Sequence, residues 1–299
     1  MSHMRMKTLA WLALLAGIYF VGDRLGAAAL DAVIARSGLR FSQLYAGQFD
    51  AQVVCIGSSR GVHGFPAVIM QELSGKRVAN ISYNGLSPRV AEPLLADYFD
   101  RCGVPEVVLI EASFVGVETD VTGVMKFSPY FGRSQRLYKL ACNMDPKCAV
   151  ISNLSQLYRY NSELIPVALN YLRRSDQGGL VRRSVPDTLA AETEAMDPIE
   201  LPLYEQEVAA LARMVQLGRE NGATVHVVLV GYLPAYRAKL ANFDTWKQQI
   251  AAGIDAPVID LTTAIDDDDA YFDRLHFNAA GSERSAALLI ERGLLGSAE

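Results

Sequence analysis

The chain has 299 residues, with 28 lysine and arginine residues against 33 acidic ones, so its formal net charge at pH 7 is −5. Hydrophobic residues make up 51% of the chain and charged residues 20%, a composition that excludes intrinsic disorder and low-complexity repeats. The lack of a basic excess argues against a nucleic-acid-binding protein. Only one segment is apolar enough to enter a bilayer, which excludes a polytopic membrane protein.

The apolar segment lies near the N-terminus. Arg5 and Lys7 precede fifteen uncharged residues, 8–22, and two charged residues follow. A basic segment followed by an apolar one is typical of an export signal. Residues 1–30 are therefore predicted to be a signal peptide, cleaved near the alanines at 27–29, or a retained signal anchor. Either alternative places the rest of the chain in the periplasm or another extracytoplasmic space. The remaining alternative is a buried helix of a cytosolic domain.

The rest of the chain alternates short apolar runs with amphipathic segments. Buried strands are predicted at 51–56, 78–81, 107–110, 225–230 and 258–261. Helices are predicted at 65–73, 87–101, 203–220, 236–254 and 280–294. Strands that alternate with helices form a parallel sheet covered on both faces, so the sequence predicts an α/β fold.

A long interval, 114–202, interrupts this alternation. It carries tyrosine, arginine and leucine at helical spacings, and we predict a mostly helical insertion that serves as a lid or substrate-binding subdomain. Five of its tyrosines are candidates for stacking on sugars, although for each one the packing of the inserted helices is the simpler interpretation: Tyr130, Tyr138, Tyr158, Tyr160 and Tyr171.

Two short segments carry candidate catalytic residues. Ser58 and Ser59 directly follow the first predicted strand, and Asp273 and His276 directly precede the last predicted helix. Ligands bind at the strand ends of such a sheet, so a serine at one end and a histidine at another can meet. The spacing lets Asp273 accept a hydrogen bond from Nδ1 of His276, which leaves Nε2 to take the proton of Ser59. Ser58 is the alternative nucleophile.

These segments resemble the motifs of the SGNH (GDSL-type) hydrolases. Gly57–Ser59 is similar to the family's first motif, and Asp273–His276 is similar to its last. The resemblance covers about 51–294 apart from the insertion. It implies a flavodoxin-like three-layer α/β/α fold, an SGNH hydrolase-like domain at 45–299, and a triad of Ser59, His276 and Asp273.

The resemblance also implies an oxyanion hole. Its donors would be the backbone N–H groups of Ser59 and Gly85, the glycine after the second predicted strand. The family's third motif, Gly-x-Asn-Asp, is absent, and Asn84 and Ser113 are the candidates to replace its donor. Three side chains near these motifs are expected to contact substrate: Arg60, His63 and Ser113.

The function that the resemblance implies is that of an extracytoplasmic serine esterase or O-acyltransferase. The Gly-Ser-Ser form and the N-terminal apolar segment look like exported members that act on acyl, foremost acetyl, esters of cell-surface or exported polysaccharide. The expected partners are an acylated glycan, a membrane-bound acyl-donor protein and the inner membrane. No cofactor, metal or nucleic acid is expected. The alternative is a non-catalytic carbohydrate-binding or assembly module, which the missing third motif favours.

Four cysteines complete the set of reactive residues. Cys142 and Cys148 flank a short polar segment, and an oxidising compartment would permit a disulfide between them, which we predict. Cys55 lies inside a strand-like apolar run and is predicted to be a small buried hydrophobic residue.

Overall fold

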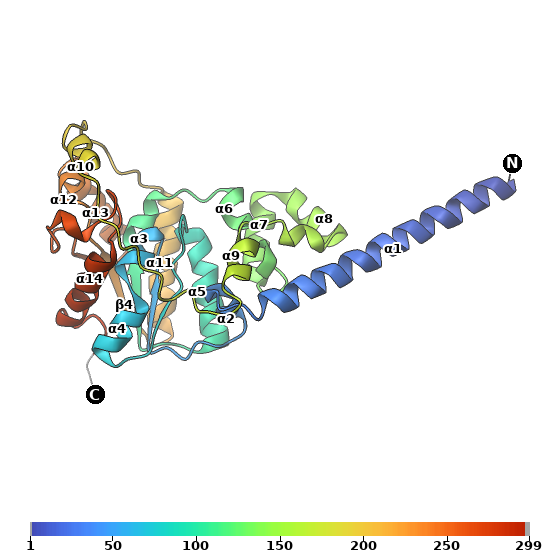
Figure 1. Ribbon diagram of the computed structural model, residues 1–299, viewed down its shortest axis with the longest axis horizontal. Coiled ribbons are helices and arrows are strands. Elements are labelled where there is room, and N and C mark those ends of the chain that lie inside the picture. The colour runs from blue at the N-terminus through green and yellow to red at the C-terminus, as the bar shows by residue number, and fades with distance from the viewer. Residues whose placement is uncertain (1, 297–299) are drawn as a thin grey trace. The chain divides into compact units, whose positions relative to one another are not determined.

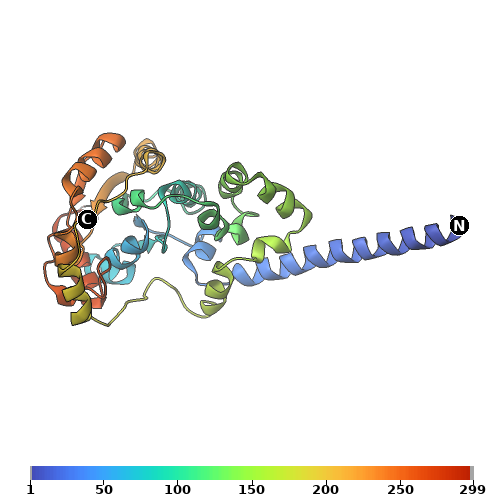
Figure 2. The same cartoon turned by 90° about the horizontal axis from the view of Figure 1, so that it is seen from above.

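The computed structural model describes residues 2–296, and its contacts divide the chain into two units (Figures 1 and 2). The anchor unit consists of Met1–Ser42 and Asp120–Arg174. The sheet unit consists of Gln43–Thr119 and Ser175–Glu299. The predicted insertion is helical, as expected, but its middle forms the anchor unit together with the N-terminal helix, and its two ends belong to the sheet unit.

The sheet unit contains a five-stranded, all-parallel sheet. Its strands are β1 (Val53–Ile56), β2 (Val78–Asn80), β3 (Val107–Glu111), β4 (Thr224–Leu229) and β5 (Val258–Asp260), in the order β2-β1-β3-β4-β5. This flavodoxin-like order reverses direction between β1 and β3, and folds of this class bind ligands at that switch point. Both strands are buried along their whole length, which explains their continuous apolar sequences.

Helices cover both faces of the sheet, and the predicted α/β fold is confirmed. One layer consists of α5 (Pro88–Cys102), α11 (Glu205–Glu220) and α13 (Phe243–Ile254), which pack against one another. In the other layer, α14 (Ala279–Glu291) packs on α3 (Ser59–Gly64) and α4 (Ala67–Ser74). The shorter elements of the unit are η1 (Ala112–Gly116), α10 (Asp187–Glu194), α12 (Pro234–Arg237) and η4 (Asp268–Ala270), and α2 (Arg40–Tyr45) crosses the boundary between the units in the sequence.

One predicted helix, 236–254, is wrong in its first part. The chain forms α12, leaves the helical path, and enters α13 at Phe243. Ile199 pairs with this intervening segment, donating its N–H to the carbonyl of Lys239 and accepting from the N–H of Ala241, both at 2.8 Å. The side chain of Asn242 also bonds both backbone groups of Leu201. These pairings use backbone groups that a continuous helix would need.

The anchor unit begins with α1 (Ser2–Ile34), a helix of 33 residues. Its part Met6–Ile34 is long and apolar enough to cross a membrane. The helix continues past the charged pair that was expected to end the apolar segment. Asp23 accepts hydrogen bonds from the Ser155 hydroxyl at 2.5 Å and from two backbone N–H groups, and Arg24 donates to two backbone carbonyls. Both charges are thereby satisfied without breaking the helix.

Short helices complete the anchor unit (Figures 1 and 2). They are α6 (Val121–Met125), η2 (Ser128–Tyr130), α7 (Gln135–Met144), α8 (Pro146–Leu154), η3 (Leu157–Tyr160) and α9 (Leu164–Asn170). Two of them, η3 and α9, contact α1. Tyr130, one of the tyrosines considered for sugar stacking, is buried here, and its hydroxyl bonds that of Ser42 at 2.9 Å. The other four are partly buried. Tyr130 therefore packs the interior of the unit, which was the simpler interpretation for each tyrosine.

The predicted disulfide is wrong, because Cys142 and Cys148 are both free thiols. The expected loop between them does not exist. Helix α7 runs to Met144 and α8 begins at Pro146, so each cysteine is held on its own helix. The Cys148 sulfur packs 3.5 Å from the Met125 sulfur. Cys55 is buried in β1, as predicted, and burial raises the pKa of its thiol.

Candidate active site

The first site segment is the connection from β1 into α3, where Ser59 is the first helical residue. Two glycines let this helix lie close to the sheet. A Cβ at Gly57 would stand 2.7 Å from the Cβ of Glu111, and a Cβ at Gly61 would stand 2.6 Å from the Ser82 hydroxyl oxygen. Larger residues would push α3 away from β3, so the glycine spacing fixes where Ser59 lies.

The far end of α3 is held by side chains from two other elements. Asn80, at the end of β2, donates to the carbonyls of Gly61 at 2.9 Å and Phe65 at 2.7 Å. Ser282 and Ser285 of α14 donate to the carbonyls of His63 and Gly64, both at 2.8 Å. Carbonyls at a helix end need such partners when they are buried. The short helix is therefore fixed at both ends.

The second site segment is the turn before α14, which carries Asp273 and His276. A bridge between Tyr271 and Phe277 closes this turn, and the Phe272 N–H donates to the carbonyl of His276 at 3.1 Å. The side chain of Asn278 caps α14 by accepting from the Gly281 N–H at 3.1 Å. The turn thus has a single backbone path, which sets the direction of the imidazole.

The structure brings the three predicted triad residues into one hydrogen-bonded chain. The Nε2 atom of His276 lies 2.7 Å from the Oγ of Ser59. Its Nδ1 lies 2.9 Å from both carboxylate oxygens of Asp273. The Asp273 Oδ1 also accepts the backbone N–H groups of Leu275 at 2.8 Å and of His276 at 2.9 Å. Such a chain can move a proton from a serine hydroxyl to an imidazole held by a carboxylate.

The carboxylate of Asp273 is held in its charged form. Partial burial acts to raise its pKa, but the hydrogen bonds from His276 and from the Leu275 backbone outweigh burial and lower the pKa below its usual value. An ionised carboxylate accepts from Nδ1, so Nδ1 carries the proton and Nε2 presents its lone pair to Ser59.

Beside Ser59 lies a cavity of about 190 Å³. Its lining comes from the ends of β1, β3 and β4 and from the two ends of the predicted insertion. Tyr232, Tyr236 and Trp246 supply its aromatic part, and the remaining lining residues are Ser58, Ser59, Arg60, Ser113, Gly116, Val117, Leu201, Pro202 and Leu275. The only polar group of the Trp246 side chain, its Nε1–H, donates to the Pro202 carbonyl at 3.0 Å. The cavity therefore offers an apolar wall next to a serine hydroxyl.

Arg60 was expected to contact substrate, but its guanidinium is turned into the protein. It is 4% exposed and donates to the carbonyls of Val230 and Gly231. Its Cζ lies 3.4 Å from the centre of the Tyr232 ring, and its Nη1 lies 3.7 Å from the fully buried carboxylate of Glu111. These partners hold the guanidinium of Arg60 inside the protein, so the residue supports the cavity wall.

Ser113 lines the cavity and takes part in a hydrogen-bond network of its own. Its hydroxyl donates to Glu111 at 2.7 Å, and its oxygen is hydrogen-bonded with the hydroxyl of Tyr232. Burial raises the pKa of Tyr232 to about 12, although Arg60 acts to lower it, so the phenol stays protonated. Because the Ser113 proton is given to Glu111, this hydroxyl is not a third oxyanion donor.

His63 does not line the cavity, but its ring packs against the candidate base. The ring centres of His63 and His276 are 5.4 Å apart, and His63 also meets Phe272 edge-on at 5.1 Å. Phe272 stacks on His276 with ring centres 5.5 Å apart. The two neighbouring rings restrict the rotation of the imidazole.

Gly85 and Asn84 occupy an exposed turn after β2. The Leu86 N–H donates to the carbonyl of Tyr83 at 3.0 Å, and Gly85 has a φ of 69°, the left-handed value that the third residue of a type II turn requires. Among the described residues that line the cavity, neither appears. The turn places them near the end of β2, outside the cavity that Ser59 borders.

Several residues of the site carry no sequence pattern that points to them. Tyr232 and Trp246 look like ordinary core aromatics, and Glu111 looks like the polar end of a strand. Their position in the sequence was the one indication that they belong to the site. Glu111 ends one correctly predicted strand, and Tyr232 follows the end of another.

No protein-family model matches the chain, and no curated protein matches it. Within residues 2–296, no group of three or more histidine, cysteine, aspartate or glutamate side chains is arranged to hold a metal ion.

Proposed function

We propose that this protein is a membrane-anchored, extracytoplasmic serine esterase or O-acyltransferase of the SGNH type. The observation that carries the proposal is the hydrogen-bonded chain Ser59–His276–Asp273 at the border of a cavity. The three residues lie in the motifs that resemble those of the family, and the strand order is the flavodoxin-like one.

In the proposed mechanism, Ser59 Oγ attacks the carbonyl carbon of an ester while His276 Nε2 takes the hydroxyl proton. The tetrahedral oxyanion accepts a hydrogen bond from the backbone N–H of Ser59. This N–H is the first of α3, so it has no partner within the helix. Gly85 is the proposed second donor, after a movement of its exposed turn toward the substrate. The imidazolium then protonates the leaving alcohol, which departs and leaves an acyl-Ser59 ester.

The second half-reaction reverses these roles. The oxygen of water, which gives hydrolysis, or of a sugar hydroxyl, which gives transfer, attacks the acyl carbon while His276 takes its proton. The bond between the acyl carbon and Ser59 Oγ then breaks, and His276 returns the proton to Oγ. The apolar wall of Tyr236, Pro202 and Val117 supports an acyl substrate at this position. The proposed acceptor is a cell-surface or exported polysaccharide, foremost with acetyl groups. A membrane-bound protein is the proposed acyl donor.

The N-terminal helix supports the location. Its exposed part is long enough and apolar enough for a span, and we assign it to the inner membrane with the remaining chain on the periplasmic side.

The decisive experiment is labelling by a fluorophosphonate, which phosphonylates activated serines. Labelling that maps to the Ser59 peptide, and that Ser59→Ala abolishes, is the expected result. A non-catalytic carbohydrate-binding module would leave the wild-type chain unlabelled. Incubation with an acetyl ester, with and without an added oligosaccharide, then distinguishes the two enzymes by mass spectrometry, because only a transferase yields an acetylated sugar.

A further inference from the structure

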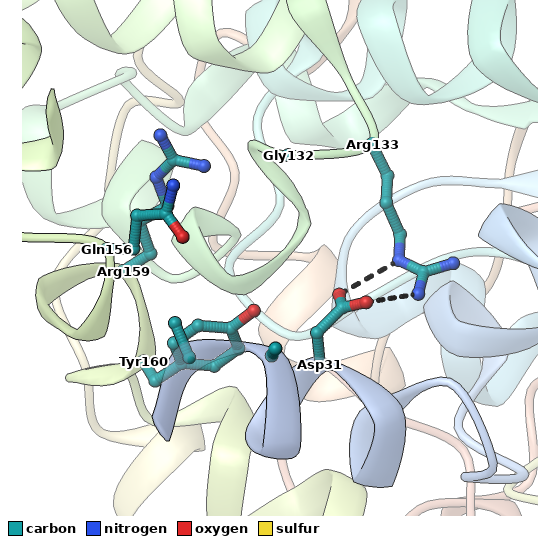
Figure 3. Close-up of a pocket in the computed structure, with 8 residues that line it drawn as sticks. Asp31, Gly132, Arg133, Gln156, Arg159 and Tyr160 are labelled. Carbon is teal, nitrogen blue, oxygen red and sulfur yellow. Dashed lines mark hydrogen bonds and ion pairs between the residues drawn. The ribbon is translucent and has the colours of Figure 1, made fainter. Parts of the chain in front are cut away.

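A second cavity, of about 260 Å³, lies within the anchor unit (Figure 3). One wall is α1, which contributes Asp31 and two alanines. The other walls carry Arg133, Gln156, Arg159 and Tyr160. In Figure 3, Arg159 and Gln156 lie on one side of the opening, and the pair Arg133–Asp31 lies on the other.

The polar groups of this cavity leave it with a positive charge. Arg133 donates to both oxygens of Asp31, at 3.1 and 2.7 Å, and the hydroxyl of Tyr160 is hydrogen-bonded to the same carboxylate. Within residues 2–296, no carboxylate is paired with Arg159. Its Nη2 donates to the carbonyl of Ser152 at 3.2 Å, and its buried Nε has no hydrogen-bond partner among these residues. Two guanidinium groups therefore face one carboxylate, so an anion is the ligand that completes the site.

Charge is divided unevenly between the two units. The anchor unit contains 13 lysine and arginine residues against 5 acidic ones, whereas the sheet unit contains 15 against 28. Arg5 and Lys7 lie at the N-terminal end of the proposed span, and without them the anchor unit still carries 11 basic residues against 5 acidic ones. A basic unit joined to a membrane helix is attracted to a leaflet that contains anionic lipid.

The cavity lies at the outer border of the lipid headgroups. Large apolar side chains of α1 are exposed from Met6 to Leu25, and 20 residues at about 1.5 Å each span the roughly 30 Å of a hydrocarbon core. Ala27 and Asp31 then lie about 3 and 9 Å beyond Leu25 along the helix axis. The polar layer of a bilayer adds about 5–7 Å on each side of the core, so Ala27 lies within this layer and Asp31 lies just outside it.

We propose that this cavity binds the phosphodiester group of an anionic phospholipid, with Arg159 and Arg133 donating to its oxygens. The proposal rests on the membrane anchoring proposed above and is independent of the ester chemistry. A bound headgroup would fix the helices of the anchor unit at the membrane surface.

The test is native mass spectrometry of the full chain in detergent with added phosphatidylglycerol. Gln156→Glu introduces a carboxylate into the cavity with little change in shape, and Arg159→Gln removes one of the two guanidinium groups. We expect each to weaken lipid retention about tenfold or more, the size expected for a charge-assisted hydrogen bond. Gln135→Glu makes the same charge change at an exposed position of the anchor unit and should keep retention within about twofold.

Equal retention in wild type, Gln156→Glu and Gln135→Glu would overturn the proposal, and so would equal losses in both glutamate variants. Displacement of the lipid by millimolar inorganic phosphate would assign the cavity to free phosphate and also overturn it. Thermal unfolding shows whether Gln156→Glu or Arg159→Gln has lost its fold. If one has, lipid retention by the other variant tests the proposal. Sedimentation with phosphatidylcholine vesicles separates the two proposals, since a wild-type chain that stays in the supernatant contradicts the anchoring itself.

Discussion

The hydroxyl oxygen of Ser59 lies 2.7 Å from Nε2 of His276, a residue 217 positions further along the chain. Two rigid segments make this distance. The glycines at 57 and 61 seat α3 on the sheet, and α14 holds the other end of α3 through Ser282 and Ser285. Since α14 also follows directly after the turn that carries His276, one helix positions both partners.

Ser59→Ala should abolish fluorophosphonate labelling and lower the rate of acetyl-ester hydrolysis by at least about 10³-fold, because the residues of a triad act as a unit. Ser58→Ala is the matched control, since this neighbouring serine also borders the cavity, and it should retain most of the rate. Hydrolysis of p-nitrophenyl acetate measures both. Retained turnover in Ser59→Ala, together with loss in Ser58→Ala, would move the nucleophile by one position.

Asp273→Asn should lower the rate by about 10²–10⁴-fold while His276→Ala lowers it as far as Ser59→Ala does. An asparagine amide that donates to Nδ1 would hold the wrong tautomer, with the proton on Nε2. The rate of fluorophosphonate labelling measures the same loss of Ser59 reactivity and does not depend on the release of a product of ester hydrolysis. Equal rates in Asp273→Asn and wild type would mean that the carboxylate only shapes the turn.

The pH dependence follows from the charges of this chain. The wild-type rate should fall at acidic pH, because a protonated Asp273 carboxyl no longer holds the imidazole of His276 in the tautomer that accepts the Ser59 proton. The pKa of Asp273 is lowered in the folded protein, so its stabilising contribution is present above the unfolded value of about 4 and is lost as the pH falls through the folded value. The rate and the free energy of unfolding should therefore both decline as the pH falls through the folded pKa of Asp273, as kinetic assays and urea unfolding over the same pH range would show. A rate that stays constant over this range would contradict the role of the carboxylate.

The fold followed from the sequence because the buried parallel strands are continuous apolar runs, each predicted within two residues of its observed ends. The triad was predictable for a related reason, since its members stand where a strand ends and a helix begins. The break before α13 was not, because it depends on pairing between Ile199 and a segment 40 residues away. The burial of the Arg60 side chain could not be predicted either, because its partners Glu111 and Gly231 come from the ends of two other strands.

Glu111→Gln should destabilise the protein by about 3–5 kcal/mol, because it leaves the buried charge of Arg60 without its carboxylate. Arg213→Gln is the control, since it breaks an exposed ion pair with Glu92 and should cost less than about 1 kcal/mol. Urea unfolding measures both free energies. Similar small losses would mean that the carbonyls of Val230 and Gly231 satisfy Arg60 on their own.

Non-reduced protein should carry four free thiols, and Cys55 should resist alkylation until the chain unfolds. Cys55 is completely buried, and the raised pKa of its thiol leaves little thiolate to react. Mass spectrometry after iodoacetamide treatment counts the labels in buffer and in urea. Only two labels in urea would show a disulfide in solution, contrary to the free Cys142 and Cys148 of the structure.

The cavity beside Ser59 should limit the size of the acyl group. Val117 lines it, and Val117→Phe would fill part of its roughly 190 Å³. We expect hydrolysis of p-nitrophenyl butyrate to fall at least about tenfold more than that of the acetate, since pockets distinguish such chains by about 1–3 kcal/mol per methylene. Val121→Phe makes the same change at an exposed position of the anchor unit and should alter neither rate. Equal losses on both esters in Val117→Phe would mean that the larger ring disturbs Ser59 itself, and unchanged rates would place the acyl chain outside this cavity.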